Sequence, residues 1–180
     1  IYNTLTEAAF NLKPSVKREI KKNIQFKDKH LGQQCFILGT GPSLNLLTEK
    51  QISLLEREII FGTNSLYKAD VASRLTPMYY SLLDNLYWEQ WSHTFKDVVD
   101  CYQEKPPTFI TDLRAKSLVE QSNSMMRHIY VYSKKYPVDI MSDQLDKNIY
   151  AAMNVVSYSI LSASYMGFKK IFLLGCDYNA

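Results

Sequence analysis

The first residues able to do chemistry lie in the segment FILGTGPSLNLL, which covers positions 36–47. Glycine permits backbone conformations and close approaches that a side chain would block, so such a loop can bring its amides close to a phosphate. Pro42 suits the first position of a helix, where the amide and hydroxyl of Ser43 would face an anion at the positive helix end. The candidate phosphate contacts are Gly39, Thr40, Gly41 and Ser43.

The same segment is equally typical of a structural turn between a strand and a helix. It lacks the GK[ST] ending of a Walker loop, and Leu44 stands where the third glycine of a GxGxxG motif would be. Taken alone, the segment leaves both interpretations open.

Further polar residues follow later apolar runs, where strands are expected to end. The Asn64 amide offers a donor and an acceptor to a base or ribose, although asparagine is as common in Asx-turns. Asp84 would supply a carboxylate, or else cap a helix that begins at Leu86. The remaining candidates from the sequence pattern are Asn154, early in a long helix, and Asp177, which follows Gly175 after the last apolar run.

Short apolar runs that alternate with helical patterns predict the elements that position these residues. Strands are expected at residues 35–38, 59–61, 78–83, 109–110, 129–132 and 171–174. Thr48 and Gln51 have the spacing of a capping box, which predicts a helix after Thr48. Longer helices are expected over residues 86–102, with Trp88 and Trp91 in the apolar stripe, and over residues 150–166.

This alternation predicts an α/β fold of the Rossmann-like type, with a mainly parallel sheet and helices on both faces. Ligands bind such sheets at the carboxyl ends of the strands, where the strand order reverses. The polar residues that follow the strands are therefore expected to share one site. No repeat or linker divides the chain, so we expect one domain over residues 32–180 after a lead-in of residues 1–31.

The lead-in is basic and partly helical. Val16, Ile20 and Ile24 recur every four residues and predict the apolar stripe of a helix that begins near Pro14. Two interpretations are open: a basic N-terminal helix that packs on the core, or peripheral contact with an anionic membrane through its lysines.

The composition excludes several classes of protein. With 46% hydrophobic and 22% charged residues in 180, the chain is an ordinary globular protein. No apolar run approaches the roughly 20 residues of a membrane span, and no secretion signal is recognisable, so a cytoplasmic location is expected. A net charge of +3 does not indicate nucleic acid. Neither the three cysteines nor the three histidines have the spacing of metal ligands.

Read together, four segments resemble a known superfamily. They are ILGTGPSL, FGTNSLY, PMYYSLLDN and NVVSYSILSASYMGFKKIFLLGCDYN, and the match covers roughly residues 34–179. Their order is similar to that in a bacterial and archaeal superfamily that includes Campylobacter-type sialyltransferases and 6-hydroxymethylpterin pyrophosphokinase-like proteins. The most specific part is GPSL early in the chain combined with GFKKIFLLGCDY late in it.

The resemblance implies a nucleotide site, for a CMP-linked sugar in the sialyltransferases and for ATP in the pterin enzymes. In the sialyltransferases, the loop that matches Gly39 to Ser43 borders the nucleotide phosphate. The positions matching Asn64, Asp84, Asn154, Val155 and residues 175–177 line the same site. The sialyltransferases have Asn where Thr40 stands and a Thr-Ser pair near Asn154, so the nucleotide itself stays open. Their catalytic histidine follows the last matched strand, so we expect a fragment whose catalytic base lies beyond Ala180.

The leading hypothesis is a glycosyltransferase-like domain that binds a nucleotide sugar for cell-surface polysaccharide or lipopolysaccharide synthesis at the inner face of the membrane. It would require no metal and would act on a glycan or glycolipid acceptor, by positioning and electrostatics. One alternative is a pyrophosphokinase that transfers diphosphate from ATP to a pterin, with Mg²⁺ held by Asp84 and Asp177. Another is a non-catalytic nucleotide-binding or assembly domain.

Overall fold

The computed structural model describes residues 1–122, 128–136, 142–152 and 154–177. These residues form a seven-stranded sheet of order β6-β5-β4-β3-β2-β1-β7, in which every pairing is parallel. The strands are β1 (Gln34–Leu38), β2 (Ile60–Thr63), β3 (Tyr79–Leu82), β4 (Thr108–Asp112), β5 (Ile129–Lys135), β6 (Asn148–Tyr150) and β7 (Lys170–Leu174). The predicted α/β, Rossmann-like fold with a parallel sheet is confirmed.

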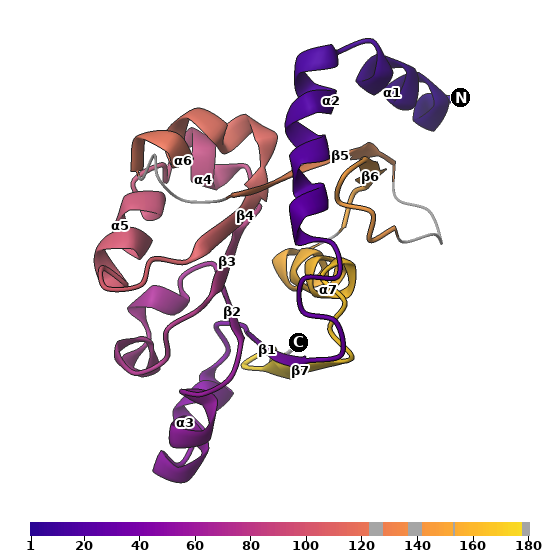
Figure 1. Cartoon of the computed structure of the whole chain (residues 1–180). Helices are drawn as coiled ribbons and strands as arrows, with labels where there is room; N and C mark the ends of the chain where they lie inside the picture. Colours follow the sequence, from indigo (N-terminus) through magenta and orange to yellow (C-terminus); the bar gives the residue numbers. More distant parts are fainter. Residues whose placement is uncertain (123–127, 137–141, 153, 178–180) are drawn as a thin grey trace.

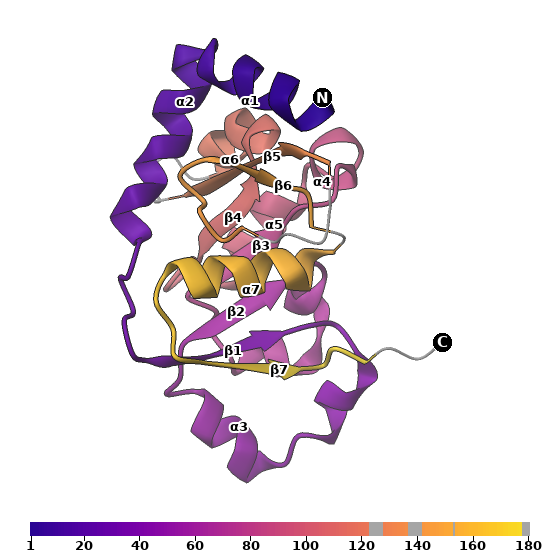
Figure 2. The ribbon, with the colours of Figure 1, turned by 90° about the vertical axis from the view of Figure 1, so that its right-hand side faces the viewer.

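Helices cover both faces of this sheet (Figures 1 and 2). The helix α7 lies on one face, and α3, α4, α5 and α6 lie on the other. The α-helices are α1 (Tyr2–Asn11), α2 (Pro14–Lys21), α3 (Glu49–Leu55), α4 (Leu86–Glu89), α5 (Thr94–Cys101), α6 (Lys116–Ser122) and α7 (Val155–Tyr165). Short 3₁₀ helices are η1 (Lys22–Phe26), η2 (Pro42–Leu46), η3 (Leu66–Lys68), η4 (Asp70–Ser73) and η5 (Leu113–Ala115).

Strand residues alternate between two hydrophobic cores, as a sheet covered on both faces requires. Tyr80 and Phe109 belong to the core beneath α3 and α5, whereas Phe61 and Tyr79 belong to the core beneath α7. The capping box before α3 is present, because the Thr48 amide donates to Gln51 Oε1 at 2.8 Å and the Thr48 side chain accepts from the Gln51 amide. None of the helices formed by the described residues is long and apolar enough to cross a membrane.

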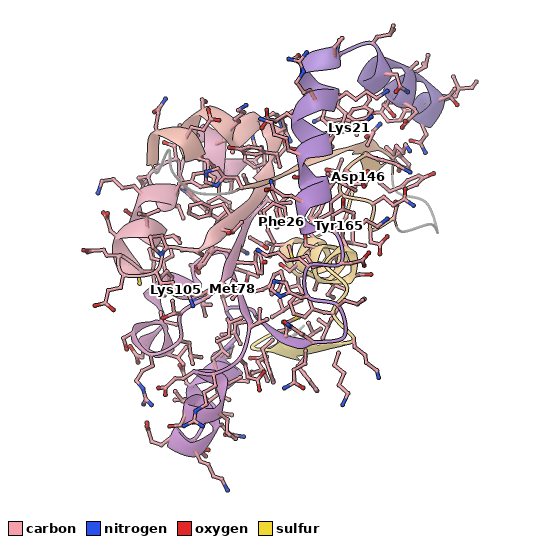
Figure 3. All side chains as sticks on the ribbon, in the orientation of Figure 1. Lys21, Phe26, Met78, Lys105, Asp146 and Tyr165 are labelled. Carbon is pink, nitrogen blue, oxygen red and sulfur yellow. The ribbon has the colours of Figure 1, made fainter. Side chains whose placement is uncertain are left out.

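The basic lead-in packs against the sheet through a different stripe from the one predicted. Ile20 is fully buried, but Ile24 is 55% exposed. The reason is that α2 ends at Lys21 and continues as the 3₁₀ helix η1, whose three-residue turn buries residues at i+3 in place of i+4. Asn23 and Phe26 therefore take the inner positions, and Phe26 lies in the same core as Tyr165 of α7 (Figure 3).

The single helix predicted over residues 86–102 is wrong. The amides of Gln90 and Trp91 both donate to the Leu86 carbonyl, at 2.9 and 2.7 Å, which closes α4 after one turn. A new helix, α5, begins at Thr94 with a different phase. Trp91 therefore leaves the predicted apolar stripe and is 45% exposed, while Phe95 stays in the core.

The helix predicted from residue 150 begins later, at Val155. The short strand β6, which the sequence patterns did not predict, includes Tyr150 and pairs with β5. The Asn154 side chain then caps α7 by accepting from the Ser157 amide at 2.9 Å.

His30 is a buried histidine in the core beneath α7. Its Nε2 lies 2.7 Å from the Tyr79 hydroxyl and its Nδ1 lies 3.1 Å from Gln33 Oε1, while its ring stacks on Phe168 with centroids 4.7 Å apart. Burial lowers the pKa of His30 in the folded protein, because the charged form loses its hydration.

This burial predicts that the fold loses stability in mild acid. Below the pKa of about 6.5 of an unfolded histidine, the unfolded chain binds a proton that folded His30 does not. The free energy of unfolding should therefore fall as the pH decreases from about 6.5. Urea unfolding at pH 8 and pH 5.5 should show a smaller decrease for His30→Gln than for the wild type. His93→Gln, at an exposed histidine, is the control and should show the same decrease as the wild type. If the free energy of unfolding falls equally in the wild type and in His30→Gln, His30 is not the source of the acid sensitivity.

Candidate functional site

The carboxyl ends of the parallel strands meet at one edge, and the strand order reverses between β1 and β7. The loops that follow these two strands touch there. The Gly39 amide donates to the Leu174 carbonyl at 2.8 Å, and the Gly41 amide donates to the Gly175 carbonyl at 2.7 Å. A Cβ at Gly39 would stand 2.3 Å from the Gly175 carbonyl oxygen, so only glycine permits this approach.

The amide and hydroxyl of Ser43 already bind a carboxylate of the chain itself. They donate to the two carboxylate oxygens of Asp177, at 2.7 and 2.6 Å. The hydroxyl and then the amide of Ser43 lower the pKa of Asp177, so this group is an anion at neutral pH. A phosphate at Ser43 would have to displace Asp177, and the phosphate contact expected of this loop stays a prediction.

Asn64 stands on a tight turn directly after β2. Its φ of 48° is in the left-handed region, which asparagine tolerates better than most residues. The Tyr80 hydroxyl fixes the turn, since it donates to the Asn64 carbonyl at 3.0 Å and accepts from the Tyr67 amide at 2.9 Å. Gly62 leaves room for Tyr80, because a Cβ there would lie 2.7 Å from the tyrosine ring.

The Asn64 side chain lies between two cavities at this edge. Its Oδ1 atom is buried and has no hydrogen-bond partner among the described residues. A buried polar atom without a partner costs roughly 1–3 kcal/mol, so this oxygen is suited to accept a hydrogen bond from a ligand.

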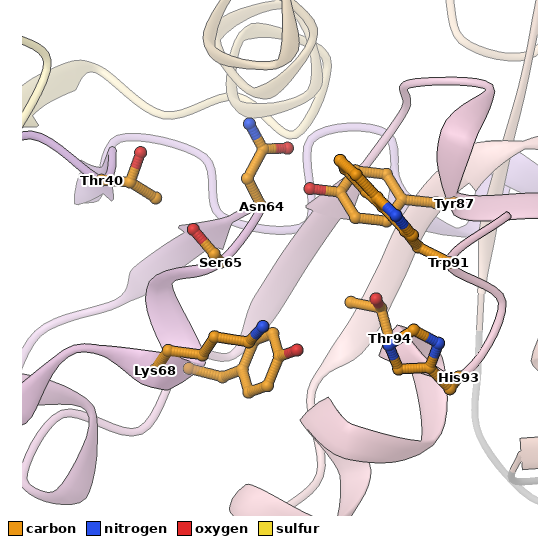
Figure 4. A pocket seen from close by; sticks show the side chains of 9 residues that line it. Thr40, Asn64, Ser65, Lys68, Tyr87, Trp91, His93 and Thr94 are labelled. Atoms are coloured by element: carbon orange, nitrogen blue, oxygen red, sulfur yellow. The ribbon is translucent and has the colours of Figure 1, made fainter.

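The first of these, the aromatic cavity, has a volume of about 400 Å³ (Figure 4). It is lined by Thr40, Asn64, Ser65, Tyr67, Lys68, Tyr87, Trp91, His93 and Thr94. The second, the central cavity, measures about 490 Å³ and is lined by Asn64, Leu83, Asp84, Asn85, Arg114, Ala152, Asn154, Val155 and Tyr158.

A third cavity, the β7 cavity, measures about 430 Å³ and shares Asn154 with the central cavity. Its polar lining includes Ser43 and Asp177, and the flank of α7 supplies Val156 and Ile160. The three cavities are linked by shared lining residues, since Asn64 joins the first two and Asn154 joins the last two.

The residues expected to form one site are therefore distributed along this edge. Asn64, Asp84, Asn154 and Val155 line the central cavity, and Ser43, Gly175, Cys176 and Asp177 line the β7 cavity. Thr40 reaches the aromatic cavity, while Gly39 and Gly41 form the contact between the two loops. Asp84 also caps the following turn, because its Oδ1 accepts from the Leu86 amide at 2.9 Å.

Arg114 is a site residue that the sequence reasoning missed. Its Nε and Nη2 donate to the two carboxylate oxygens of buried Asp112, at 2.9 and 3.1 Å, and its guanidinium lies 4.7 Å from the Trp88 ring centroid. The carboxylate and the indole fix a cation at the wall of the central cavity. The sequence feature that could have identified Arg114 is its position two residues after Asp112, which ends β4 at the same edge of the sheet.

The aromatic side chains of the site differ in part from those expected. Sequence position makes Tyr79, Tyr80 and Tyr158 candidates for stacking on a base. Tyr158 lines the central cavity, but Tyr79 and Tyr80 are fully buried in the cores. Tyr67, Tyr87 and Trp91 line a cavity in their place. The break between α4 and α5 brings Trp91 there, and a helical pattern gives no sign of such a break.

The charged residues of this edge do not gather into a metal centre within the part of the chain that the structure describes. No three His, Cys, Asp or Glu side chains there lie close enough together to hold a metal ion. Asp84 and Asp177, the pair expected to hold Mg²⁺ in the pyrophosphokinase alternative, line different cavities.

The fold and its carboxyl edge define an α/β domain of the Rossmann-like class. The chain belongs to the family described as 6-hydroxymethylpterin diphosphokinase MptE-like, whose model matches residues 2–180. No curated protein sequence matches it.

A solved structure has a similar fold, the MAf glycosyltransferase from Magnetospirillum magneticum AMB-1, with a TM-score of 0.54 and 16% sequence identity. The similarity covers 91% of this chain but 29% of that protein, so this chain spans less than a third of its length. The family match confirms the superfamily suspected from the sequence, and the solved structure shows that a glycosyltransferase shares the fold.

The contact between the loops after β1 and β7 predicts a severe effect of a small substitution. Gly39→Ala should lower the free energy of unfolding by roughly 1–3 kcal/mol, because its Cβ would overlap the Gly175 carbonyl and force the loops apart. Ser65→Ala, at an exposed position on the same edge, should change it by less than about 0.5 kcal/mol. Urea denaturation measures both, and equal midpoints would show that the contact is dispensable.

Proposed function

We propose that this chain is the nucleotide-binding domain of a glycosyltransferase, which holds a nucleotide sugar in the central cavity while an acceptor hydroxyl attacks the sugar. The observation that carries the proposal is the Asn64 amide at the carboxyl edge of a parallel sheet. A fixed turn holds it, and its buried oxygen has no hydrogen-bond partner in the part of the chain that the structure describes. A base amino group or a ribose hydroxyl supplies the hydrogen bond that this oxygen lacks.

In this proposal the other residues of the central cavity bind the remaining parts of the nucleotide. Arg114 donates to a phosphate through the guanidinium N–H groups that do not bind Asp112, and a guanidinium fixed by Asp112 and Trp88 loses little freedom on binding. Asp84 accepts a hydrogen bond from a ribose hydroxyl through the carboxylate oxygen that does not cap Leu86. The acceptor oxygen bonds to the sugar carbon and its proton is released to water. The phosphate leaves with the electron pair of the broken bond to the sugar, and the fixed cation stabilises that charge.

The setting proposed for this reaction is the inner face of a membrane, in the synthesis of a cell-surface polysaccharide or lipopolysaccharide. The basic side chains of α2 support it, because Arg18 and Lys21 are exposed. Cations at this surface favour an anionic membrane or an acidic glycolipid acceptor.

The second candidate is a diphosphokinase that acts on a pterin with ATP, and the description of the family favours it. This reaction needs a divalent cation between the phosphates and the protein. Asp84 would be the nearer ligand, whereas Asp177 would first have to release the amide and hydroxyl of Ser43.

Nucleotide binding is tested by substitutions in the central cavity. Asn64→Gly keeps the left-handed turn accessible and removes the amide, and Arg114→Gln removes the cation. Each should weaken binding by roughly 1–3 kcal/mol, which is about 5-fold to 150-fold in Kd. The measurement is calorimetric titration with whichever of CMP, CDP, UDP, GDP and ATP raises the melting temperature most.

Arg57→Gln is the matched control for Arg114→Gln. It removes the same charge at the opposite edge of the sheet, beside Gln34 and Lys170, and should leave the affinity unchanged. The proposal fails if none of the five nucleotides stabilises the protein, or if Asn64→Gly binds as tightly as the wild type.

Metal dependence separates the two candidate reactions. For a nucleotide-sugar site built on Asn64 and Arg114, the affinity for the nucleotide should be the same in EDTA and in millimolar Mg²⁺. For the diphosphokinase, ATP binding should be strengthened by Mg²⁺ and should lose that dependence in Asp84→Asn. A strong Mg²⁺ requirement for every nucleotide would overturn the leading proposal in favour of the second.

A further inference from the structure

The aromatic cavity lies beside the central cavity and shares Asn64 with it. Figure 4 shows Trp91 and Tyr87 on one side of this space, with His93 and Thr94 nearby and Lys68 across from them. A ligand here would stand next to the nucleotide sugar of the proposed reaction, which is where an acceptor has to bind.

Two aromatic rings form a corner in this cavity. The rings of Tyr87 and Trp91 meet at an interplanar angle of 63° with centroids 5.9 Å apart, and Trp91 is 45% exposed while Tyr87 is buried. An exposed indole with a second ring beside it offers an apolar wall, against which the C–H face of a sugar ring can pack. The corner is therefore suited to a sugar ring.

Polar groups surround the corner, as recognition of a sugar requires. Thr40, Ser65 and Thr94 offer hydroxyl groups. His93 offers its ring nitrogen atoms, and Asn64 offers its amide nitrogen and oxygen. The His93 Nε2 lies 3.9 Å from Asp97, whose carboxylate also accepts from the Tyr67 hydroxyl at 3.2 Å. These groups provide several directed hydrogen bonds around an apolar wall.

Lys68 adds a positive charge to the cavity. Its ammonium lies 5.4 Å from the Tyr67 ring centroid, and it forms no ion pair with any described residue. An ammonium group at the rim of a sugar-sized cavity is suited to a carboxylate or a phosphate on the ligand.

We propose that the aromatic cavity is the acceptor subsite of this transferase, and that it binds a sugar ring with a carboxylate or phosphate substituent. The ring packs on Trp91 and Tyr87, its acidic group pairs with Lys68, and a hydroxyl points toward Asn64 and the central cavity. The name acceptor subsite rests on the proposed glycosyl transfer, but binding of an acidic sugar to this cavity can be measured without any reaction.

The experiment uses tryptophan fluorescence, because the chain has two tryptophans. In Trp88→Phe the remaining Trp91 reports on the cavity directly. The ligands are glucuronic acid, galacturonic acid, N-acetylneuraminic acid, glucose 6-phosphate and galactose 6-phosphate, with glucose and galactose as uncharged counterparts. At least one acidic sugar should change the emission with a millimolar Kd, and should bind at least fivefold more tightly than its uncharged counterpart.

Saturation-transfer NMR on the unmodified chain gives the same information if Trp88→Phe does not fold. Trp91→Ala should abolish the signal of the acidic sugar, while Tyr136→Ala, which removes another exposed ring, should retain it. Lys68→Gln should remove the preference for the acidic sugar, and the exposed Lys50→Gln should keep it. Comparing the affinities for uronic acids with those for sugar phosphates shows whether the cavity prefers a carboxylate or a phosphate.

The outcomes separate this inference from the proposed function. If nucleotides bind but no acidic sugar does, the acceptor subsite is wrong and the nucleotide site stands. If acidic sugars bind at Trp91 but no nucleotide does, the cavity is a sugar site and the proposed transfer fails. Two results would overturn the assignment of this cavity to an acidic acceptor. In the first, a nucleotide quenches Trp91 and competes with the sugar; in the second, a pterin quenches Trp91 and no sugar does.

Discussion

The site depends on the parallel pairing of β1 with β2 on one side and with β7 on the other. Because both neighbours run in the same direction as β1, the three carboxyl ends meet at one edge, although β7 comes more than a hundred residues later. The loops after β1 and β7 then approach so closely that Gly39 and Gly41 leave no space for a side chain. Asp177 completes this contact by binding Ser43.

A second constraint comes from the interior of the sheet. Tyr80 crosses the space that Gly62 leaves open, and its hydroxyl fixes the turn of Asn64 and Tyr67. A buried tyrosine in a strand thus fixes the backbone turn that carries the Asn64 side chain, in the way that supporting hydrogen bonds preorganise many binding sites. The strained backbone of Asn64 persists because the surrounding strands and this hydroxyl hold it.

The three cavities along the edge differ in chemistry. The central cavity combines the amide of Asn64, the carboxylate of Asp84 and the fixed cation of Arg114, which suits a ligand with a phosphate and hydrogen-bonding groups. The aromatic cavity offers an angled apolar corner at Trp91 and the ammonium group of Lys68, which suits an acidic sugar. Asn64 lines both cavities, and the proposed two-substrate transfer would need such neighbouring sites with a shared wall.

The sequence alone determined the fold class and most of the residues that lie at the carboxyl edge of the sheet. Apolar runs of strand length between helical patterns predicted six of the strands, because burial on both faces of a parallel sheet demands such runs. Polar and glycine residues after those runs then predicted which positions would share an edge. The strand β6 was missed because its three residues begin with Asn148 and carry no such run.

Tertiary structure alone decided which of those residues line the cavities at this edge. The close contact between Gly39 and Gly175 and the binding of Ser43 by Asp177 join residues far apart in the sequence, so no local pattern contains them. The exposure of Trp91 depends on a helix break that hydrogen bonds to the Leu86 carbonyl produce. Local patterns determine which segments are buried, whereas the direction of a side chain at a strand end depends on what packs against its loop, and that is fixed only when the chain folds.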